Sequence, residues 1–141
     1  AASDVYKRQN IDVALQFMTN AIKKRCSAFL ISDFIDDHDY FKSMSIANRK
    51  HDLASIQVYD RRDAEMPDVG LVRVRDLERG TDRWLDTSSS SARKAYAKAW
   101  YERQQRLASV TARSGVDLAS VTTDEDFVKA LLGLFRRRGS R

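Results

Sequence analysis

The chain has 141 residues, of which 43% are hydrophobic, 32% charged and 9% aromatic, and its formal net charge is +5. One proline and five glycines argue against a disordered, collagen-like or linker-rich protein, so we expect one modest globular domain or a large piece of one. No apolar run approaches the roughly 18 residues that a membrane helix needs.

The first residues predict a chain that lacks its natural start. Ala1 is not a methionine, and residues 1–4 lack the basic-then-apolar layout of a signal peptide. The single cysteine, Cys26, cannot form an internal disulfide and suits a reducing compartment, so we expect a cytoplasmic location.

The first part of the chain alternates between helix and strand patterns. Residues 10–25 carry apolar side chains at helical spacing, with Asn10 as the cap and basic residues 23–25 in the last turn. Residues 26–32 are apolar without alternation, which predicts a strand covered on both faces. A second helix is expected to open with acidic residues, and a second strand is expected over 53–59.

The middle of the chain departs from this alternation. Residues 70–75 and 83–86 flank a turn and predict an inserted β-hairpin. The serines at 88–91 predict the entry of a long helix that ends near Gly115.

The last part of the chain returns to a strand, over 116–121, and a helix. Thr123 and Asp126 resemble a capping box for this closing helix. We expect the helix to pack with five apolar residues, namely Phe127, Val128, Leu131, Leu134 and Phe135. The predicted fold class is therefore α/β, with a Rossmann-like parallel sheet of three strands flanked by helices and an inserted β-hairpin.

Ligands of parallel α/β sheets bind beyond the carboxyl ends of the strands, and three polar joints are expected there. They are residues 32–37, 59–62 and 122–124. Asp33 lies at a strand end, so it fits a hard cation such as Mg²⁺ and a plain surface residue equally well. Three other acids, Asp36, Asp37 and Asp39, are better explained as residues that stabilise the N-terminus of the second helix.

Nucleophilic catalysis has little support in the sequence. Cys26 begins a strand that should be buried, and spacing places neither histidine beside it. His38 could pair with the neighbouring acids, although a surface position is the simpler interpretation. For His51 the simpler interpretation is a cation at a helix end. No glycine-rich phosphate loop and no nucleophile-elbow motif is present.

Basic residues cluster at 23–25 and in the Arg-rich tail at 136–141. A nucleic-acid interface interleaves cations with aromatic residues, and here the aromatic residues lie elsewhere in the chain. Trp84, Trp100, Tyr96 and Tyr101 are instead expected to pack in the core and hairpin. The sequence therefore disfavours nucleic-acid binding and favours a solvated tail.

Several short strings in a fixed order carry a resemblance to a known family. They are NIDVAL (10–15), FLISDF (29–34), NRKHD (48–52), VYD (58–60), PDVGL (67–71), DTSS (86–89), SGVD (114–117) and TDEDF (123–127). Over residues 10–138 the chain resembles the domain of unknown function 58 family, bacterial proteins with a von Willebrand factor A-like domain. The family's genes commonly sit beside those of MoxR-type AAA+ ATPases, which implies an adaptor role rather than catalysis.

The resemblance also implies a metal-ion-dependent adhesion site built from three loops. Asp33 matches the aspartate of the third loop. The Asp-x-Ser-x-Ser loop has no counterpart in this chain, and the threonine of the second loop would fall at about Gln9, where the match breaks. The resemblance allows Mg²⁺ in the full-length protein, but one carboxylate without its partners predicts no cofactor in this fragment.

From this resemblance we expect three regions. Residues 1–9 would be a non-native leader, 10–138 the C-terminal half of a von Willebrand A-like domain, and 139–141 a basic tail. The strand that ends at Asp33 would then lose its central neighbour and lie at a sheet edge.

The expected function is a protein-interaction module, not an enzyme, with a MoxR-type AAA+ ATPase as its partner and no membrane partner. Two alternatives stay open. One is a magnesium-dependent hydrolase or phosphatase that uses the acidic loop from Asp33 to Asp37. The other is nucleic-acid binding through the Arg-rich tail.

Overall fold

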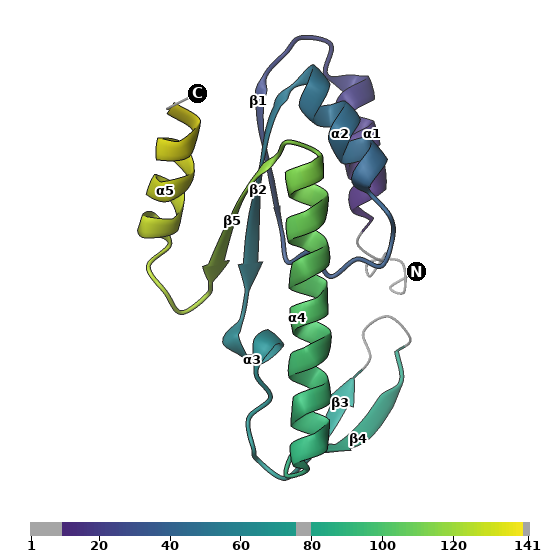
Figure 1. Ribbon diagram of the computed structural model, residues 1–141. Helices are drawn as coiled ribbons and strands as arrows, with labels where there is room; N and C mark the ends of the chain where they lie inside the picture. The colour runs from purple at the N-terminus through teal and green to yellow at the C-terminus, as the bar shows by residue number, and fades with distance from the viewer. Residues whose placement is uncertain (1–9, 76–79, 140–141) are drawn as a thin grey trace. The chain divides into compact units, whose positions relative to one another are not determined.

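The computed structural model describes residues 10–75 and 80–139 (Figure 1). The expected leader at 1–9 and the last two residues of the expected tail lie outside the described residues. The chain divides into two compact units, each described here by itself. The sheet unit contains the described residues up to Tyr59 and those from Arg106 onward, and the hairpin unit contains Asp60–Gln105.

The sheet unit is built on three parallel strands, which confirms the predicted fold class. They are β1 (Ser27–Ser32), β2 (Asp52–Tyr59) and β5 (Asp117–Thr122), in the order β1-β2-β5. Ser32 lies opposite Gln57, and Tyr59 lies opposite Thr122. The strands therefore end at one common edge, the carboxyl edge, and begin at the opposite amino edge.

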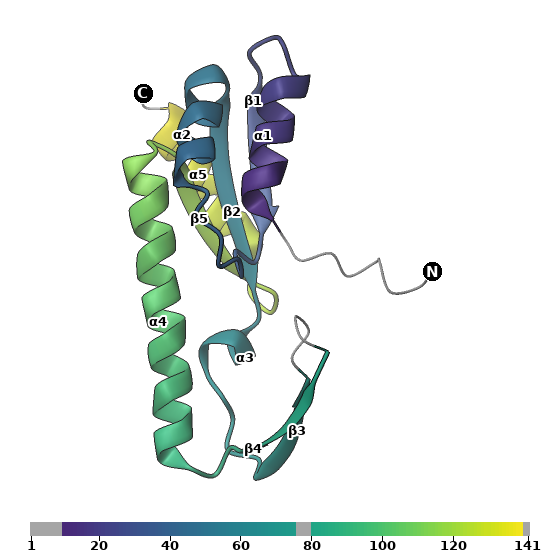
Figure 2. The ribbon, with the colours of Figure 1, turned by 90° about the vertical axis from the view of Figure 1, so that its right-hand side faces the viewer.

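Helices cover both faces of this sheet (Figures 1 and 2). One face carries α1 (Ile11–Ala21), α2 (Phe41–Lys50) and the last turns of α4 (Ser90–Arg113), and the other carries α5 (Phe127–Gly139). The buried core of the first face is formed by Ile11, Leu15, Phe34, Tyr40, Met44, Ala47, Leu53, Leu107 and Val116. The second face has a smaller core, formed by Ala54, Ala119 and Leu134.

Strand β1 lies at an edge of the sheet, as expected, but it is not covered on both faces. Its burial alternates along the strand, and Phe29 and Ile31 are 45% and 63% exposed. The prediction of a doubly covered strand is therefore wrong. Phe29 meets the Phe135 ring edge to face, with the centroids 6.0 Å apart, and stays partly exposed because α5 packs mainly over β2 and β5.

The expectation that five apolar residues of α5 pack against the core is also wrong. Leu134 is fully buried, whereas Phe127, Val128 and Phe135 are largely exposed. Within the described residues, the buried cluster under α5 consists of Ala54, Ala119 and Leu134, so most of the helix's apolar surface lies outside it.

The helix boundaries correct three expectations. Helix α1 is capped by Asn10 as predicted but ends at Ala21, so the basic residues 23–25 follow it instead of forming its last turn. Helix α2 begins at Phe41, so Asp36 and Asp37 precede its first turn. Helix α5 begins at Phe127, where Asp126 accepts a hydrogen bond from the backbone of the second helical residue, so Thr123 is not its cap.

The hairpin unit contains α3 (Arg61–Ala64), β3 (Leu71–Arg75), β4 (Asp82–Asp86) and the first turns of α4. Strands β3 and β4 pair in antiparallel register, which confirms the inserted hairpin. Trp84 is 65% exposed and Tyr101 is also exposed, so the prediction that these rings pack is wrong. Tyr96 is half-buried, and its hydroxyl donates to the carbonyl of Arg62 at 2.8 Å.

Candidate functional site

The structure places Asp33 at the carboxyl edge, directly after β1. The residue is half-buried, and its Oδ1 accepts a hydrogen bond from the backbone N–H of Ile35 at 3.0 Å. Phe34 follows with a φ of 56° and is buried, so the chain turns sharply here and fixes the direction of the Asp33 side chain. The predicted location of Asp33 is therefore confirmed.

A chain of hydrogen bonds runs from Asp33 across the sheet. Gln57 of β2 is fully buried, and its Nε2 donates to the carbonyl of Asp33 at 3.5 Å. The Oε1 of Gln57 accepts from the hydroxyl of Ser120 in β5 at 3.0 Å. The three strand ends are thus joined by side chains as well as by the backbone ladder.

Two further buried hydroxyls lie on the same two strands. Within the described residues, Ser55 Oγ and Thr122 Oγ1 have no hydrogen-bond partner. Ser55 and Gln57 alternate with Ala54 and Ile56, which pack toward α5, so they face the α1 and α2 side of the sheet. The sequence analysis missed this polar row, although the alternation of polar residues in β2 carried its signal.

Asp36 has a structural task that the sequence analysis assigned to the wrong helix. Its side chain is 1% exposed and accepts the backbone N–H of Ile11 at 2.8 Å, at the start of α1. It also accepts the backbone N–H of His38 at 2.9 Å and lies 2.5 Å from that residue's Nδ1. Burial raises the pKa of Asp36, but the hydrogen bonds from Ile11 and His38 outweigh it and lower the pKa overall.

The other two acids of the loop, Asp37 and Asp39, differ from each other in their contacts. Asp39 Oδ1 accepts the backbone N–H of Phe41 at 3.0 Å and so stabilises the start of α2, as expected. Asp37 is exposed. His38 is a surface residue held by Asp36 rather than by its two sequence neighbours.

The carboxyl edge does not provide a Mg²⁺ site from these residues. Within the part of the chain that the structure describes, no group of three His, Cys, Asp or Glu side chains could hold a metal ion. The carboxylates of Asp33 and Asp36 are both engaged by backbone N–H groups. The residues from Asp33 to Asp37 therefore do not fit the cation.

At the amino edge, the structure brings together two residues that the sequence analysis kept apart. The Sγ of Cys26 lies 3.4 Å from the Nδ1 of His51. His51 directly follows α2, at the helix end where the sequence analysis placed it, and is fully buried.

The Arg-rich segment is also more tightly held than a solvated tail. Arg138 forms an ion pair with Asp52, and its Nη1 lies 3.5 Å from Asp117 Oδ2 and 3.2 Å from the carbonyl of Leu53. Its side chain is only 15% exposed. Arg137 donates to the carbonyl of Leu118 at 3.3 Å, so two of the three arginines bind the sheet.

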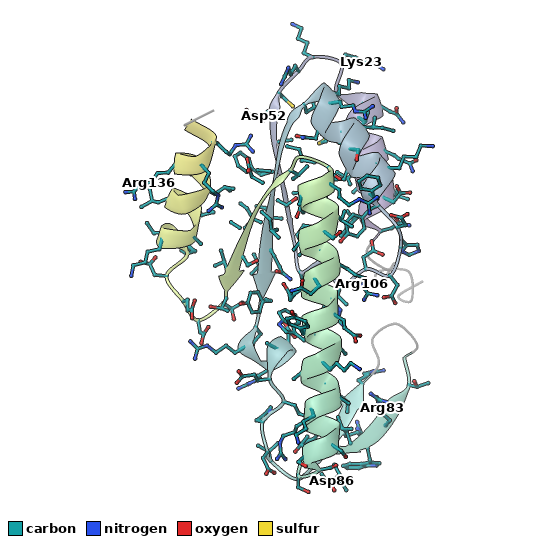
Figure 3. All side chains as sticks on the ribbon, in the orientation of Figure 1. Lys23, Asp52, Arg83, Asp86, Arg106 and Arg136 are labelled. Atoms are coloured by element: carbon teal, nitrogen blue, oxygen red, sulfur yellow. The ribbon has the colours of Figure 1, made fainter. Side chains whose placement is uncertain are left out.

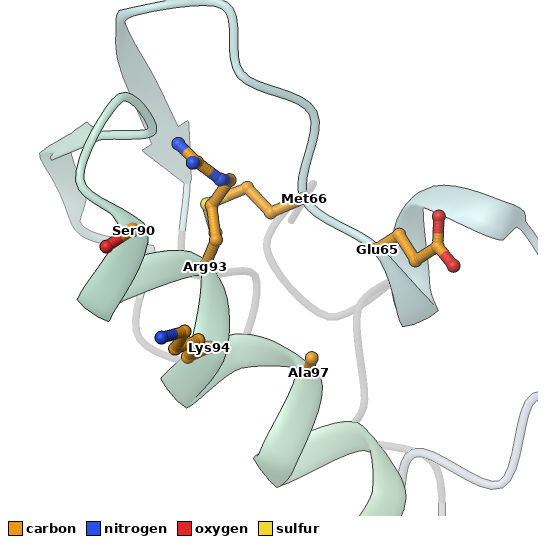
Figure 4. Close-up of a pocket in the computed structure, with 6 residues that line it drawn as sticks. All are labelled: Glu65, Met66, Ser90, Arg93, Lys94 and Ala97. Carbon is orange, nitrogen blue, oxygen red and sulfur yellow. The ribbon is translucent and has the colours of Figure 1, made fainter.

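The hairpin unit has a surface cavity of about 340 Å³ (Figure 4). Its lining residues are Glu65, Met66, Ser90, Arg93, Lys94 and Ala97. Arg93 is already engaged, since its Nη1 donates to the carbonyls of Thr87 and Ser88 and pairs with Asp68 at 3.2 Å. The Arg93 guanidinium is therefore already taken up by acceptors of the protein itself.

None of the described helices combines the length and the apolar character needed to cross a bilayer.

Comparison with known proteins identifies relatives without a defined activity. A family model described as "Protein of unknown function DUF58" matches residues 2–106. An uncharacterized protein of Mycobacterium avium is 27% identical over 135 residues, which cover 94% of this chain and 79% of the relative. Uncharacterized proteins of Mycobacterium bovis and Mycobacterium tuberculosis are each 29% identical, and this chain spans 42% of their length. No solved structure matches the chain.

Proposed function

The chain belongs to the DUF58 family of proteins of unknown function, and from this membership we propose that it is part of a protein-interaction module. The module would be of the von Willebrand A-like type and would act with a MoxR-type AAA+ ATPase, as the family resemblance implies. It would not itself be an enzyme. Because the chain spans 42% of the length of two of its relatives, the proposal concerns the whole protein of which such a chain forms a part.

One observation carries this proposal, namely the position of Asp33. The residue lies at the tip of an edge strand, where three parallel strands end together. Its backbone is held by Gln57, which is held in turn by Ser120. A carboxylate on a rigid rim offers a partner a fixed acceptor at little cost in conformational entropy.

The proposal predicts that the Asp33 side chain contributes to binding of the ATPase. The test uses the full-length protein and a MoxR-type AAA+ ATPase of the same organism, with affinity measured by biolayer interferometry. Asp33→Asn keeps the oxygen that accepts the Ile35 N–H but removes the charge, so the fold is preserved. We expect a loss of affinity of roughly tenfold, or about 1.4 kcal/mol.

Asp37→Asn is the matched control, because it removes an exposed carboxylate from the same loop. It should leave the affinity unchanged. Equal affinity of both variants and the unchanged protein would refute the role of Asp33. A magnesium-dependent phosphatase activity that disappears in Asp33→Asn would instead establish the hydrolase alternative.

A further inference from the structure

The single cysteine of the chain is held beside a buried histidine. Cys26 is half-buried, and its Sγ lies 3.4 Å from the Nδ1 of His51. The backbone fixes this contact at both residues. The N–H of Asp52 donates to the carbonyl of Cys26 at 2.9 Å, and the N–H of His51 donates to the carbonyl of Ala47 at 2.8 Å.

The other nitrogen of the His51 ring is an independent observation. His51 is fully buried, and within the described residues its Nε2 has no hydrogen-bond partner. A buried polar group that is left unpaired destabilises the fold, so packing alone does not account for a histidine here. The other ring nitrogen, Nδ1, faces the Cys26 thiol, so the ring is placed to accept the thiol proton at that atom.

The surroundings of the pair are cationic. Three exposed basic residues, Lys23, Lys24 and Arg25, directly precede Cys26. Asp52 follows His51, but it is paired with Arg138. Figure 3 shows Lys23 and Asp52 at the same end of the sheet. An anionic reagent is therefore attracted to the end of the sheet that carries Cys26, while a neutral one is not.

We propose that Cys26 and His51 form a thiol modification site that reacts with small anionic disulfides. In this step the Cys26 thiol gives its proton to His51 Nδ1, and the thiolate attacks one sulfur of the disulfide. A new S–S bond forms at Cys26 while the bond within the disulfide breaks. The leaving thiolate takes the proton back from His51, so the products are a mixed disulfide and one free thiol.

The test measures the rate of disulfide exchange with two chromogenic reagents. Dithiobis(nitrobenzoate) is a dianion and dithiodipyridine is neutral, and each releases one coloured thiol for each cysteine modified. N-acetylcysteinamide at the same pH serves as the unassisted reference. With the neutral reagent, the folded chain should react about tenfold faster than the reference, because His51 assists the proton transfer. With the anionic reagent this advantage should be larger still, and 1 M salt should remove the difference between the reagents.

Two sets of variants separate the histidine from the cations. His51→Gln should lower the rate with both reagents by about tenfold, provided that circular dichroism shows it is folded. The double variant Lys24→Gln, Arg25→Gln changes only exposed side chains. It should lower the rate with the anionic reagent several-fold and leave the neutral reagent's rate unchanged.

Two results would overturn the proposal. One is a folded, unaltered chain that reacts with the neutral reagent no faster than N-acetylcysteinamide does. The other is a double variant that reacts with both reagents as the unaltered chain does. The first comparison needs no variant, so it decides the role of the pair even if His51→Gln fails to fold.

Discussion

Arg138 should be one of the main attachments between α5 and the sheet, and replacing it should destabilise the protein. The substitution Arg138→Met keeps most of the aliphatic stem but removes the guanidinium. That group donates to the carbonyl of Leu53 and pairs with Asp52 and Asp117. Because the side chain is only 15% exposed, water replaces these partners poorly.

The magnitude follows from the separate contacts. Asp52 is more than half exposed, so its ion pair contributes less than about 1 kcal/mol. Asp117 is 13% exposed, and the hydrogen bonds made on this more buried side contribute about 1.5–2 kcal/mol. We therefore expect the free energy of unfolding to fall by about 2 kcal/mol, and the Tm to fall by about 8 °C.

Urea denaturation followed by circular dichroism measures this loss. Arg136→Met is the matched control, since Arg136 is an exposed residue of the same helical turn. It should change the free energy of unfolding by less than about 0.5 kcal/mol. If the two variants were equally stable, the ion pairs of Arg138 would contribute nothing, and the tail would be solvated as the sequence analysis expected.

Three further predictions concern other parts of the fold. Asp36→Ala should cost about 1.5 kcal/mol at pH 6, because it removes the buried acceptor of the Ile11 N–H at the start of α1, beside the Asn10 cap. Since folding lowers the pKa of Asp36 below its ordinary 3.8, its contribution is complete above that pH and is lost as the pH falls through the folded value. Urea titrations should therefore show the difference in stability between Asp36→Ala and the unaltered protein shrinking as the pH falls below 3.8, and a difference that stays constant would contradict the assignment. Gly115→Ala should lower the Tm, at a cost of about 1 kcal/mol, because Gly115 has a φ of +68° and a Cβ would lie 3.4 Å from Asn48 Nδ2. Gly133→Ala, within α5, should instead raise the Tm slightly, because this glycine has ordinary helical backbone angles. If both substitutions shifted the Tm in the same direction, the role given to the positive φ of Gly115 would be refuted. Trp84→Thr should change the free energy of unfolding by less than about 0.5 kcal/mol in the same assay, whereas a larger loss would show that the indole packs.

Local patterns were enough to predict the alternation of helices and strands. The spacing of apolar residues predicted α1 and β2, and the alternating residues 70–75 with the return at 83–86 predicted the hairpin. The position of Asp33 followed from the same reasoning, because the end of a strand is a local property and the carboxyl ends of parallel strands share an edge. These features depend on neighbours within a few residues of one another.

Such local patterns did not predict contacts between residues that are far apart in the sequence. Cys26 and His51 are 25 positions apart, and they meet because β1 and β2 pair in a register that starts both strands at one edge. Asp36 contacts Ile11 across the same number of positions and so supports α1 instead of α2. The coverage of β1 was mispredicted for a related reason, since an apolar run does not reveal how many neighbours its strand has.

The edge position of β1 has a practical consequence for the isolated chain. Within the described sheet, one side of this strand has no neighbouring strand, and the exposed side chains of Phe29 and Ile31 form a hydrophobic surface beside it. An exposed edge strand of this kind can pair with the same strand of a second molecule, and this self-association increases with protein concentration. Light scattering should therefore rise steeply as the protein is concentrated, and a lysine in place of Ile31 should suppress that rise without unfolding the sheet.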